Sequence, residues 1–258
     1  MQWSLEHGMM VRRVGRGPRI VWIHGLGESS VSFEPIIARL PAFEHVLVDL
    51  PGYGRSPWPD TALGIDETAD HLARWLPPDA TLVGHSMGGV LATFVAERNT
   101  TVRAVVDIDG NLSRGDCTFS SRVLPHSVDD FRARGFAELR AQIYADGATS
   151  AALRGYFAAL MFASPDAYFR QSHDLVSLCL SDQLAPRLAA LRVPTLFIAG
   201  GMPEGISAES RTLLDHHRIR WLSLEPSGHW VYVDQPERFA AELAGFVTEV
   251  GPTASSNA

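Results

Sequence analysis

Short apolar runs separated by amphipathic segments recur along the first half of the chain. Four of these runs have the length of strands, at residues 19–23, 45–50, 81–83 and 102–108. Runs that are apolar on both faces are typical of strands buried in a parallel sheet. Apolar positions at helical spacing in residues 33–40 and 65–76 separate them, which predicts right-handed crossovers. The pattern therefore predicts an α/β fold with a mostly parallel, doubly wound sheet.

The alternation of strand and helix stops between residues 111 and 191. This stretch contains no convincing strand pattern but several helical patterns, at residues 131–144, 151–162 and 167–180. The simplest interpretation is a helical insertion, residues 111–191, within a core made of residues 1–110 and 192–250.

Both ends of the core carry weaker patterns. Residues 2–14 alternate weakly and predict an edge hairpin that turns near His7 and Gly8. Strand patterns resume at residues 194–199 and 219–224, and a last helix follows Pro236. The small, polar residues 251–258 predict a disordered tail.

The charge balance limits the partners of the protein. Its 258 residues carry 22 Lys+Arg against 29 Asp+Glu, and the basic residues are scattered. Neither nucleic acid nor an anionic membrane is therefore an expected partner. Cys117 and Cys179 have no metal-ligand spacing and are too few for a disulfide scaffold, which indicates a reducing compartment. No stretch has the pattern of a signal peptide or a membrane span, so we predict a soluble, cytoplasmic protein of unknown oligomeric state.

The stretch from Thr81 to Val90 carries the strongest chemical signal. It passes from an apolar strand through Gly84-His85-Ser86-Met87-Gly88 into a helical pattern. Gly-x-Ser-x-Gly between a strand and a helix is typical of a nucleophile elbow, a strained turn that exposes the serine hydroxyl above the sheet. The helix start directs backbone N–H groups and its positive dipole end to the same point. We therefore predict that Ser86 attacks a carbonyl group.

A serine nucleophile needs a base to accept its proton and a third group to orient that base. Ten histidines compete for the role of base. His229 is the best placed, because it follows the last predicted strand on the carboxyl side, where open α/β sheets build their sites. It also follows Ser86 in the chain order Ser, acid, His that this chemistry uses on such folds.

Four motifs together resemble those of the α/β-hydrolase superfamily, in particular its serine esterases and lipases. They are His24-Gly25 after the first buried strand, the loop from Asp49 to Ser56, Gly-His-Ser-Met-Gly-Gly around Ser86, and Gly228-His229 with Gln235-Pro236-Glu237. The resemblance covers nearly the whole chain outside the insertion, which it implies is a helical cap. It also implies that Ser86 is the nucleophile and His229 the base. The oxyanion hole would be formed by the backbone N–H groups of Met87 and Leu26, and His24 would order its loop.

The acid departs from the commonest pattern of that superfamily. Most members carry an aspartate shortly after the strand that here ends at residue 199, where this chain has Met202-Pro203 and then Glu204. Some members carry the acid one strand earlier, and that strand here ends at Asp109. An ionised side chain at the tip of an apolar strand is costly without a partner, which favours a role for Asp109. We predict Asp109 as the acid, with Glu204 in reserve and Asp107 as a weaker candidate.

These residues predict hydrolysis of an ester, thioester or lactone with an apolar acyl part, through an acyl-enzyme on Ser86. We expect a small-molecule substrate and neither a metal nor an organic cofactor. An acyltransferase, a biosynthetic thioesterase and a C–C bond hydrolase would use the same triad and stay open as alternatives. Dehalogenase and epoxide hydrolase activities are disfavoured, because those relatives need an aspartate at position 86. A non-catalytic ligand-binding protein on the same fold is the alternative from another class.

Overall fold

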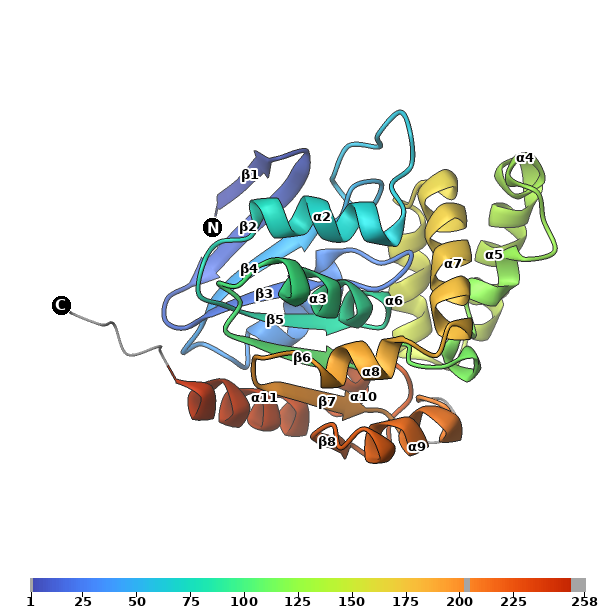
Figure 1. Cartoon of the computed structure of the whole chain (residues 1–258). Coiled ribbons are helices and arrows are strands. Elements are labelled where there is room, and N and C mark those ends of the chain that lie inside the picture. The colour runs from blue at the N-terminus through green and yellow to red at the C-terminus, as the bar shows by residue number, and fades with distance from the viewer. Residues whose placement is uncertain (1, 202–204, 252–258) are drawn as a thin grey trace.

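The computed structural model describes residues 2–201 and 205–251, in which one sheet is covered by helices (Figure 1). The sheet has eight strands in the order β1-β2-β4-β3-β5-β6-β7-β8. The strands are β1 (Gln2–Glu6), β2 (Met9–Gly15), β3 (Arg19–Ile23), β4 (Glu44–Asp49), β5 (Ala80–His85), β6 (Ala104–Ile108), β7 (Thr195–Ala199) and β8 (Trp221–Ser223). β2 is antiparallel to β1 and β4, and the other neighbours are parallel. The predicted hairpin and the mostly parallel α/β sheet are confirmed.

The direction of winding changes at β3. The chain passes from β3 to β4 on one side and then returns to β5 on the other side of β3. Ligands of open α/β sheets bind outside the carboxyl ends of the strands at such a switch point. The loop that follows Ile23 and the turn that follows His85 meet there, because Ile23 pairs with Gly84 in the sheet.

Helices cover both faces of the sheet, which explains why its parallel strands are apolar on both faces. α2 (Ile65–Trp75), α3 (Met87–Arg98) and α8 (Leu184–Ala189) lie on one face (Figure 1). α1 (Glu34–Ile37), α10 (Val231–Asp234) and α11 (Pro236–Val250) pack together on the other face. α9 (Ala208–His216) lies beside β8 at the edge. Every residue of β5 is buried between these layers.

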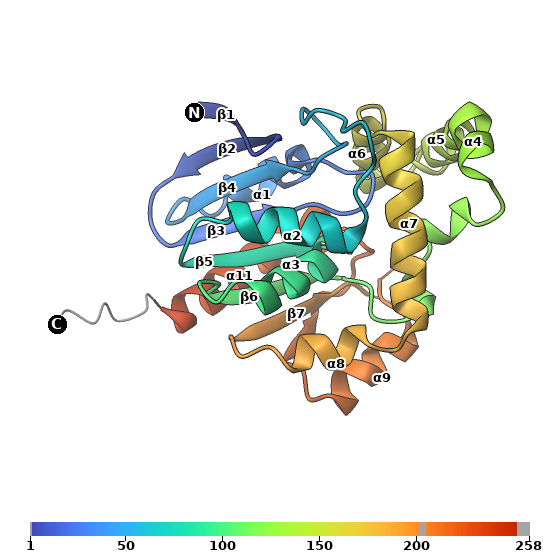
Figure 2. The same cartoon turned by 45° about the horizontal axis from the view of Figure 1, so that its top comes forward.

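The chain between β6 and β7 forms helices and turns only. These elements are η2 (Arg114–Asp116), η3 (Ser120–Val123), α4 (Val128–Asp130), the π-helical turn η4 (Phe131–Gly135), α5 (Phe136–Asp146), α6 (Ala151–Leu160) and α7 (Pro165–Leu180), followed by α8. α5, α6 and α7 lie beyond the carboxyl ends of the parallel strands, in the view of Figure 1 and again in that of Figure 2. We call residues 111–191 the helical segment. Its last helix, α8, packs against α3 rather than over the strand ends.

Three details differ from the sequence-based expectation. The helix expected over residues 33–40 is a 3-10 turn, η1 (Ser30–Phe33), followed by the single turn of α1. The strand expected over residues 219–224 has the three residues of β8. α9 has no counterpart in the predicted elements. Residues 252–258 of the predicted tail lie outside the described residues.

Candidate active site

Ser86 lies on the tight turn between β5 and α3. Its backbone has φ 53° and ψ −123°, a conformation that is strained for a residue with a Cβ atom. The turn is held by a hydrogen bond from Ser86 N to Ile108 O at 2.9 Å. A Cβ atom at Gly84 would overlap the carbonyl oxygen of Gly88, so strand and helix approach each other only because position 84 is glycine. The predicted strand, turn and helix around Ser86 are therefore present.

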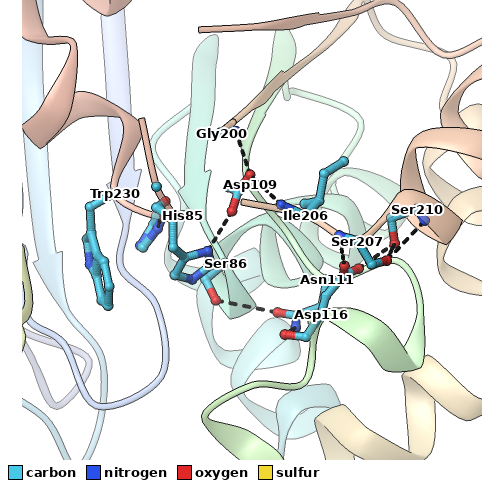
Figure 3. Close-up of polar contacts among 12 residues, drawn as sticks. His85, Ser86, Asp109, Asn111, Asp116, Gly200, Ile206, Ser207, Ser210 and Trp230 are labelled. Carbon is cyan, nitrogen blue, oxygen red and sulfur yellow. Dashed lines mark hydrogen bonds and ion pairs between the residues drawn. The ribbon is translucent and has the colours of Figure 1, made fainter. Parts of the chain in front are cut away.

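His229 and Asp109 come together from two loops that are distant in sequence. His229 Nδ1 lies 2.6 Å from Asp109 Oδ2, although the two residues are 120 positions apart in the chain. The other oxygen of Asp109 accepts hydrogen bonds from Gly200 N at 2.7 Å and Ile206 N at 3.2 Å (Figure 3). These hydrogen bonds fix the position of the Asp109 carboxylate. Because Asp109 contacts Nδ1 of His229, it does not occupy the other ring nitrogen, Nε2.

The hydroxyl of Ser86 donates a hydrogen bond to Asn111 Oδ1 at 3.4 Å (Figure 3). The Asn111 amide is itself oriented, because its nitrogen donates to Asp116 O at 2.9 Å. Hydrogen bonds between catalytic groups are often long or misaligned without substrate, so this geometry is compatible with a serine that turns toward a base during reaction. Asn111 was not among the predicted site residues.

Asp107, the weaker candidate acid, has no hydrogen bond to His229 among the described residues. Asp107 is buried between Gly89 and Gly110, where a Cβ on either glycine would overlap its carboxyl group. Burial, together with the negative charge of Asp109, raises the pKa of Asp107 well above its ordinary value. The raised pKa favours the neutral form of Asp107, which makes it a poorer partner for an imidazolium than Asp109. Glu204 lies outside the described residues.

A buried carboxylate that sequence reasoning missed lies next to the predicted triad. Glu28 is 2% exposed and accepts hydrogen bonds from Gly25 N at 2.8 Å, from His85 Nδ1 at 3.0 Å and from the indole N–H of Trp230. Burial alone would raise the pKa of Glu28, but the charge of His85 and the accepted hydrogen bonds lower it to about 2. Burial opposes the charged form of His85, yet the Glu28 carboxylate raises the pKa of His85 above its ordinary value. The two side chains form a buried ion pair.

His24 has the loop-ordering contacts that the resemblance implied. Its Nε2 accepts the backbone N–H of Leu50 at 3.0 Å, and its Nδ1 donates to Gly25 O at 2.8 Å. Burial lowers the pKa of His24, which keeps the ring neutral and suited to one donor and one acceptor. In the same loop, Asp49 accepts Ser30 N at 2.7 Å and Arg55 N at 2.9 Å.

Of the two residues predicted to form an oxyanion hole, Met87 follows Ser86 directly and Leu26 lines the same cavity. Met87 is the first residue of α3, where backbone N–H groups have no partner within the helix. Leu26 lies in the loop after β3 and lines the same cavity as Ser86. The next residue, Gly27, has φ 74°, and a Cβ atom there would lie 2.7 Å from Leu160 and 2.9 Å from Tyr168. The loop of Leu26 is therefore packed directly beneath α6 and α7.

A cavity of about 700 Å³ opens over Ser86 and His229. Its wall is formed by the strand-end loops, by η2 and η3, by α6 and by the loop after β7. A second cavity of about 500 Å³ shares Ala152, Tyr156 and Trp230 with the first. Tyr156 and Trp230 are in ring contact at 5.4 Å, so an aromatic pair separates the two spaces. The cavity is large enough for a small-molecule substrate.

No helix among the described residues is long and apolar enough to cross a membrane.

The sheet, the serine turn and the histidine loop together define an α/β hydrolase. Residues 20–242 match the model of the Alpha/beta hydrolase family, and the chain belongs to that family of enzymes. An esterase, EaEST, from Exiguobacterium antarcticum has the same fold, with a TM-score of 0.75 and 20% identity over 93% of this chain and 95% of that chain. E-2-(acetamidomethylene)succinate hydrolase superimposes with a TM-score of 0.71 at 24% identity, over 93% of this chain and 95% of that chain.

Proteins similar to this chain in sequence are named for different activities. Polyketide synthase ThaQ from Burkholderia thailandensis is 30% identical over 254 residues, which are 93% of this chain but 12% of that protein. Pimeloyl-[acyl-carrier protein] methyl ester esterase from Shewanella oneidensis is 37% identical over 93 residues, 36% of this chain and 35% of that esterase. The esterase of the same name from Xylella fastidiosa is 25% identical over 261 residues, which cover 93% of this chain and 98% of that esterase. The chain thus spans much less than two thirds of the first two relatives.

Proposed function

We propose that this chain is a serine hydrolase that cleaves an ester, thioester or lactone with an apolar acyl part through an acyl-enzyme on Ser86. The observation that carries this proposal is the 2.6 Å contact between His229 and Asp109 beside a serine on a strained strand-to-helix turn. Ser86, His229 and Asp109 line one cavity. A nucleophile, a base and an acid that orients the base are the groups that acyl transfer to serine requires.

In the proposed mechanism, His229 Nε2 accepts the proton of Ser86 while Asp109 holds Nδ1–H and stabilises the imidazolium. The serine oxygen attacks the carbonyl carbon, and the backbone N–H groups of Met87 and Leu26 stabilise the oxyanion by roughly 3–4 kcal/mol each. His229 then protonates the leaving group. Water attacks the acyl-enzyme with His229 again as base, which releases the acid and restores Ser86.

The relatives support ester chemistry and also favour one alternative. Several of them are named esterases and hydrolases, which agrees with the proposed reaction class. The match to ThaQ covers nearly all of this chain and only a small part of a polyketide synthase. That match favours, as a second candidate, a biosynthetic thioesterase or acyltransferase, in which the same acyl-enzyme is formed from a thioester.

The proposed function is tested by turnover together with active-site labelling. Wild-type protein is expected to hydrolyse p-nitrophenyl hexanoate with saturation kinetics, and a serine-directed fluorophosphonate is expected to abolish turnover by labelling Ser86. Peptide mass spectrometry locates the label. A protein that neither turns over esters nor labels at Ser86 would contradict the proposal and return attention to ligand binding.

The charges around the cavity support an uncharged acyl part. Its described wall contains neither lysine nor arginine, and its acidic members are Glu28, Asp109, Asp116, Asp146 and Asp234. Arg122 contacts the outer side of the wall residue Phe119, with its guanidinium 5.2 Å from the ring, but does not line the cavity. His85 also lines the cavity but is already paired with Glu28, so a carboxylate moved from water into this cavity would find neither lysine nor arginine along its described wall, and burying an unpaired charge is costly.

We therefore expect strong discrimination against an anionic acyl chain. The p-nitrophenyl monoester of adipic acid, in which a carboxylate replaces the terminal methyl group of the hexanoate, is expected to have a kcat/KM about 100-fold lower. Steady-state kinetics of the two esters measures the ratio. Thr149 is an exposed residue of the wall, where an arginine would supply a positive charge. Thr149→Arg is therefore expected to reduce the ratio of kcat/KM between the two esters, whereas Thr149→Gln is not. Equal turnover of both esters by wild-type protein would rule out this specificity.

A further inference from the structure

The Glu28–His85 ion pair contacts the loop that precedes Leu26 and the loop that carries His229. Glu28 accepts a hydrogen bond from Gly25, which precedes the proposed oxyanion donor Leu26. His85 is the residue before Ser86, and its Nε2 lies 3.0 Å from the main-chain oxygen of His229. The indole of Trp230, which follows His229, donates to the second oxygen of Glu28.

The partners of His85 fix its protonation. A main-chain carbonyl oxygen can only accept a hydrogen bond, so Nε2 of His85 carries a hydrogen. Glu28 also accepts from Gly25 and Trp230, and its lowered pKa together with the raised pKa of His85 places the shared proton on Nδ1 of His85. His85 is therefore a doubly protonated donor that joins Glu28 to the main chain of His229. Hydrogen bonds to charged groups are stronger than neutral ones, which makes this a firm connection.

Stability alone is a poor explanation for such a pair. Both side chains are almost fully buried, with 1% and 2% exposure. Removing two charges from water costs several kcal/mol per ion, and well-packed apolar residues often replace a buried ion pair without loss of stability. The pair is also set directly under the base, since the rings of His85 and His229 have centroids 4.6 Å apart.

We propose that Glu28 and His85 are positioning residues. They hold the loop that carries His229 and the loop that carries Leu26 in place relative to Ser86. Both residues also line the cavity, but the positioning role acts through His229 O, Trp230 and Gly25. The proposal rests on the proposed function of Ser86 and His229. It adds a second buried acid–histidine pair, separate from Asp109–His229, to the site.

The deciding variant is Glu28→Gln, which keeps the shape of the side chain. Its NH₂ group replaces one carboxylate oxygen and, being a donor, cannot accept the hydrogen bond that this oxygen accepted. Misplacement of reacting groups by about 1 Å costs about 100-fold in rate, so we expect kcat for p-nitrophenyl hexanoate to fall about 100-fold. KM is expected to change less than about twofold, because the cavity wall is otherwise intact. Fluorophosphonate labelling of Ser86 is expected to slow in parallel.

Glu44→Gln is the matched control. Glu44 pairs with Arg19 at 2.9 Å at the amino end of the parallel strands, away from the site. Thermal unfolding of both variants separates stability from rate. Glu44→Gln is expected to keep the wild-type kcat, and a Glu28→Gln protein with lowered Tm but wild-type kcat would overturn the proposal.

A second variant covers the case in which Glu28→Gln does not fold. Trp230→Phe removes the indole donor to Glu28 together with part of the buried ring system but keeps an aromatic ring, and we expect kcat to fall about tenfold with a smaller change in KM. A folded Trp230→Phe protein with unchanged kcat would then overturn the proposal. Wild-type protein without turnover and without Ser86 labelling would instead show that the proposed function is wrong, and the positioning role would fall with it.

Discussion

Ser86→Ala is expected to lower kcat for p-nitrophenyl hexanoate by roughly 10⁴- to 10⁶-fold. Alanine removes the oxygen that forms the acyl-enzyme, while the turn that carries it is compatible with any residue of similar size. Residual turnover would come from water attacking a carbonyl bound in the cavity. Burst kinetics of p-nitrophenol release measure the effect, since the variant is also expected to lose the burst that reports acylation.

Ser172→Ala serves as the control for this experiment. Ser172 is buried on α7, outside the cavity wall, and its hydroxyl has no hydrogen-bond partner in the described part of the chain. Its replacement is expected to leave kcat unchanged. Turnover by Ser86→Ala within tenfold of wild type would exclude a covalent role for this serine.

Asp109→Asn is expected to lower kcat about 10⁴-fold while the protein stays folded. Asparagine is similar in shape but offers no negative charge to Nδ1–H of His229, so the ring loses its orientation and the imidazolium its partner. Measurement of kcat and of thermal unfolding for the same preparation separates this effect from misfolding.

Asp107→Asn is a close control, because Asp107 is also buried and lies in β6, two residues before Asp109. Its raised pKa favours the neutral carboxyl, and its side chain is not the partner of His229, so replacement by an amide is expected to have little effect on kcat. Glu204→Gln is expected to behave like Asp107→Asn. A loss of rate in Glu204→Gln that matches or exceeds that in Asp109→Asn would identify Glu204 as the acid instead.

The parallel sheet could be predicted because its strands are nearly continuous apolar runs. Residues 19–23 were predicted at the bounds of β3, since buried parallel strands have no polar face to obscure the pattern. The sequence pattern did not predict α9, because few of its residues are apolar. Only Ser210 and Leu214 are buried, which leaves almost no periodic signal. The three residues of β8 are all partly exposed, and its ends are set by pairing with β7 rather than by local pattern.

The residues of the candidate site also fall into those that the sequence predicts and those that it does not. Ser86 carries a local signature, and His229 follows from chain order, so both could be predicted without knowledge of contacts. Glu28 could not, because its partner Trp230 is 202 positions away and a single charged residue in a glycine-rich loop is usually solvated. Asn111 is likewise defined by the approach of two loops rather than by any motif.

The packing of Gly27 has a consequence for how this enzyme can diversify. A Cβ atom at position 27 would force the side chains of Leu160 and Tyr168 to shift, so the loop beside the proposed catalytic serine and the helices α6 and α7 are closely packed together. A substitution at Leu160 or Tyr168 that admits a bulkier substrate is therefore expected to alter the packing of the loop that carries Leu26 as well. Broader substrate scope and high turnover are therefore in conflict in this molecule, and variants selected for one are expected to lose part of the other.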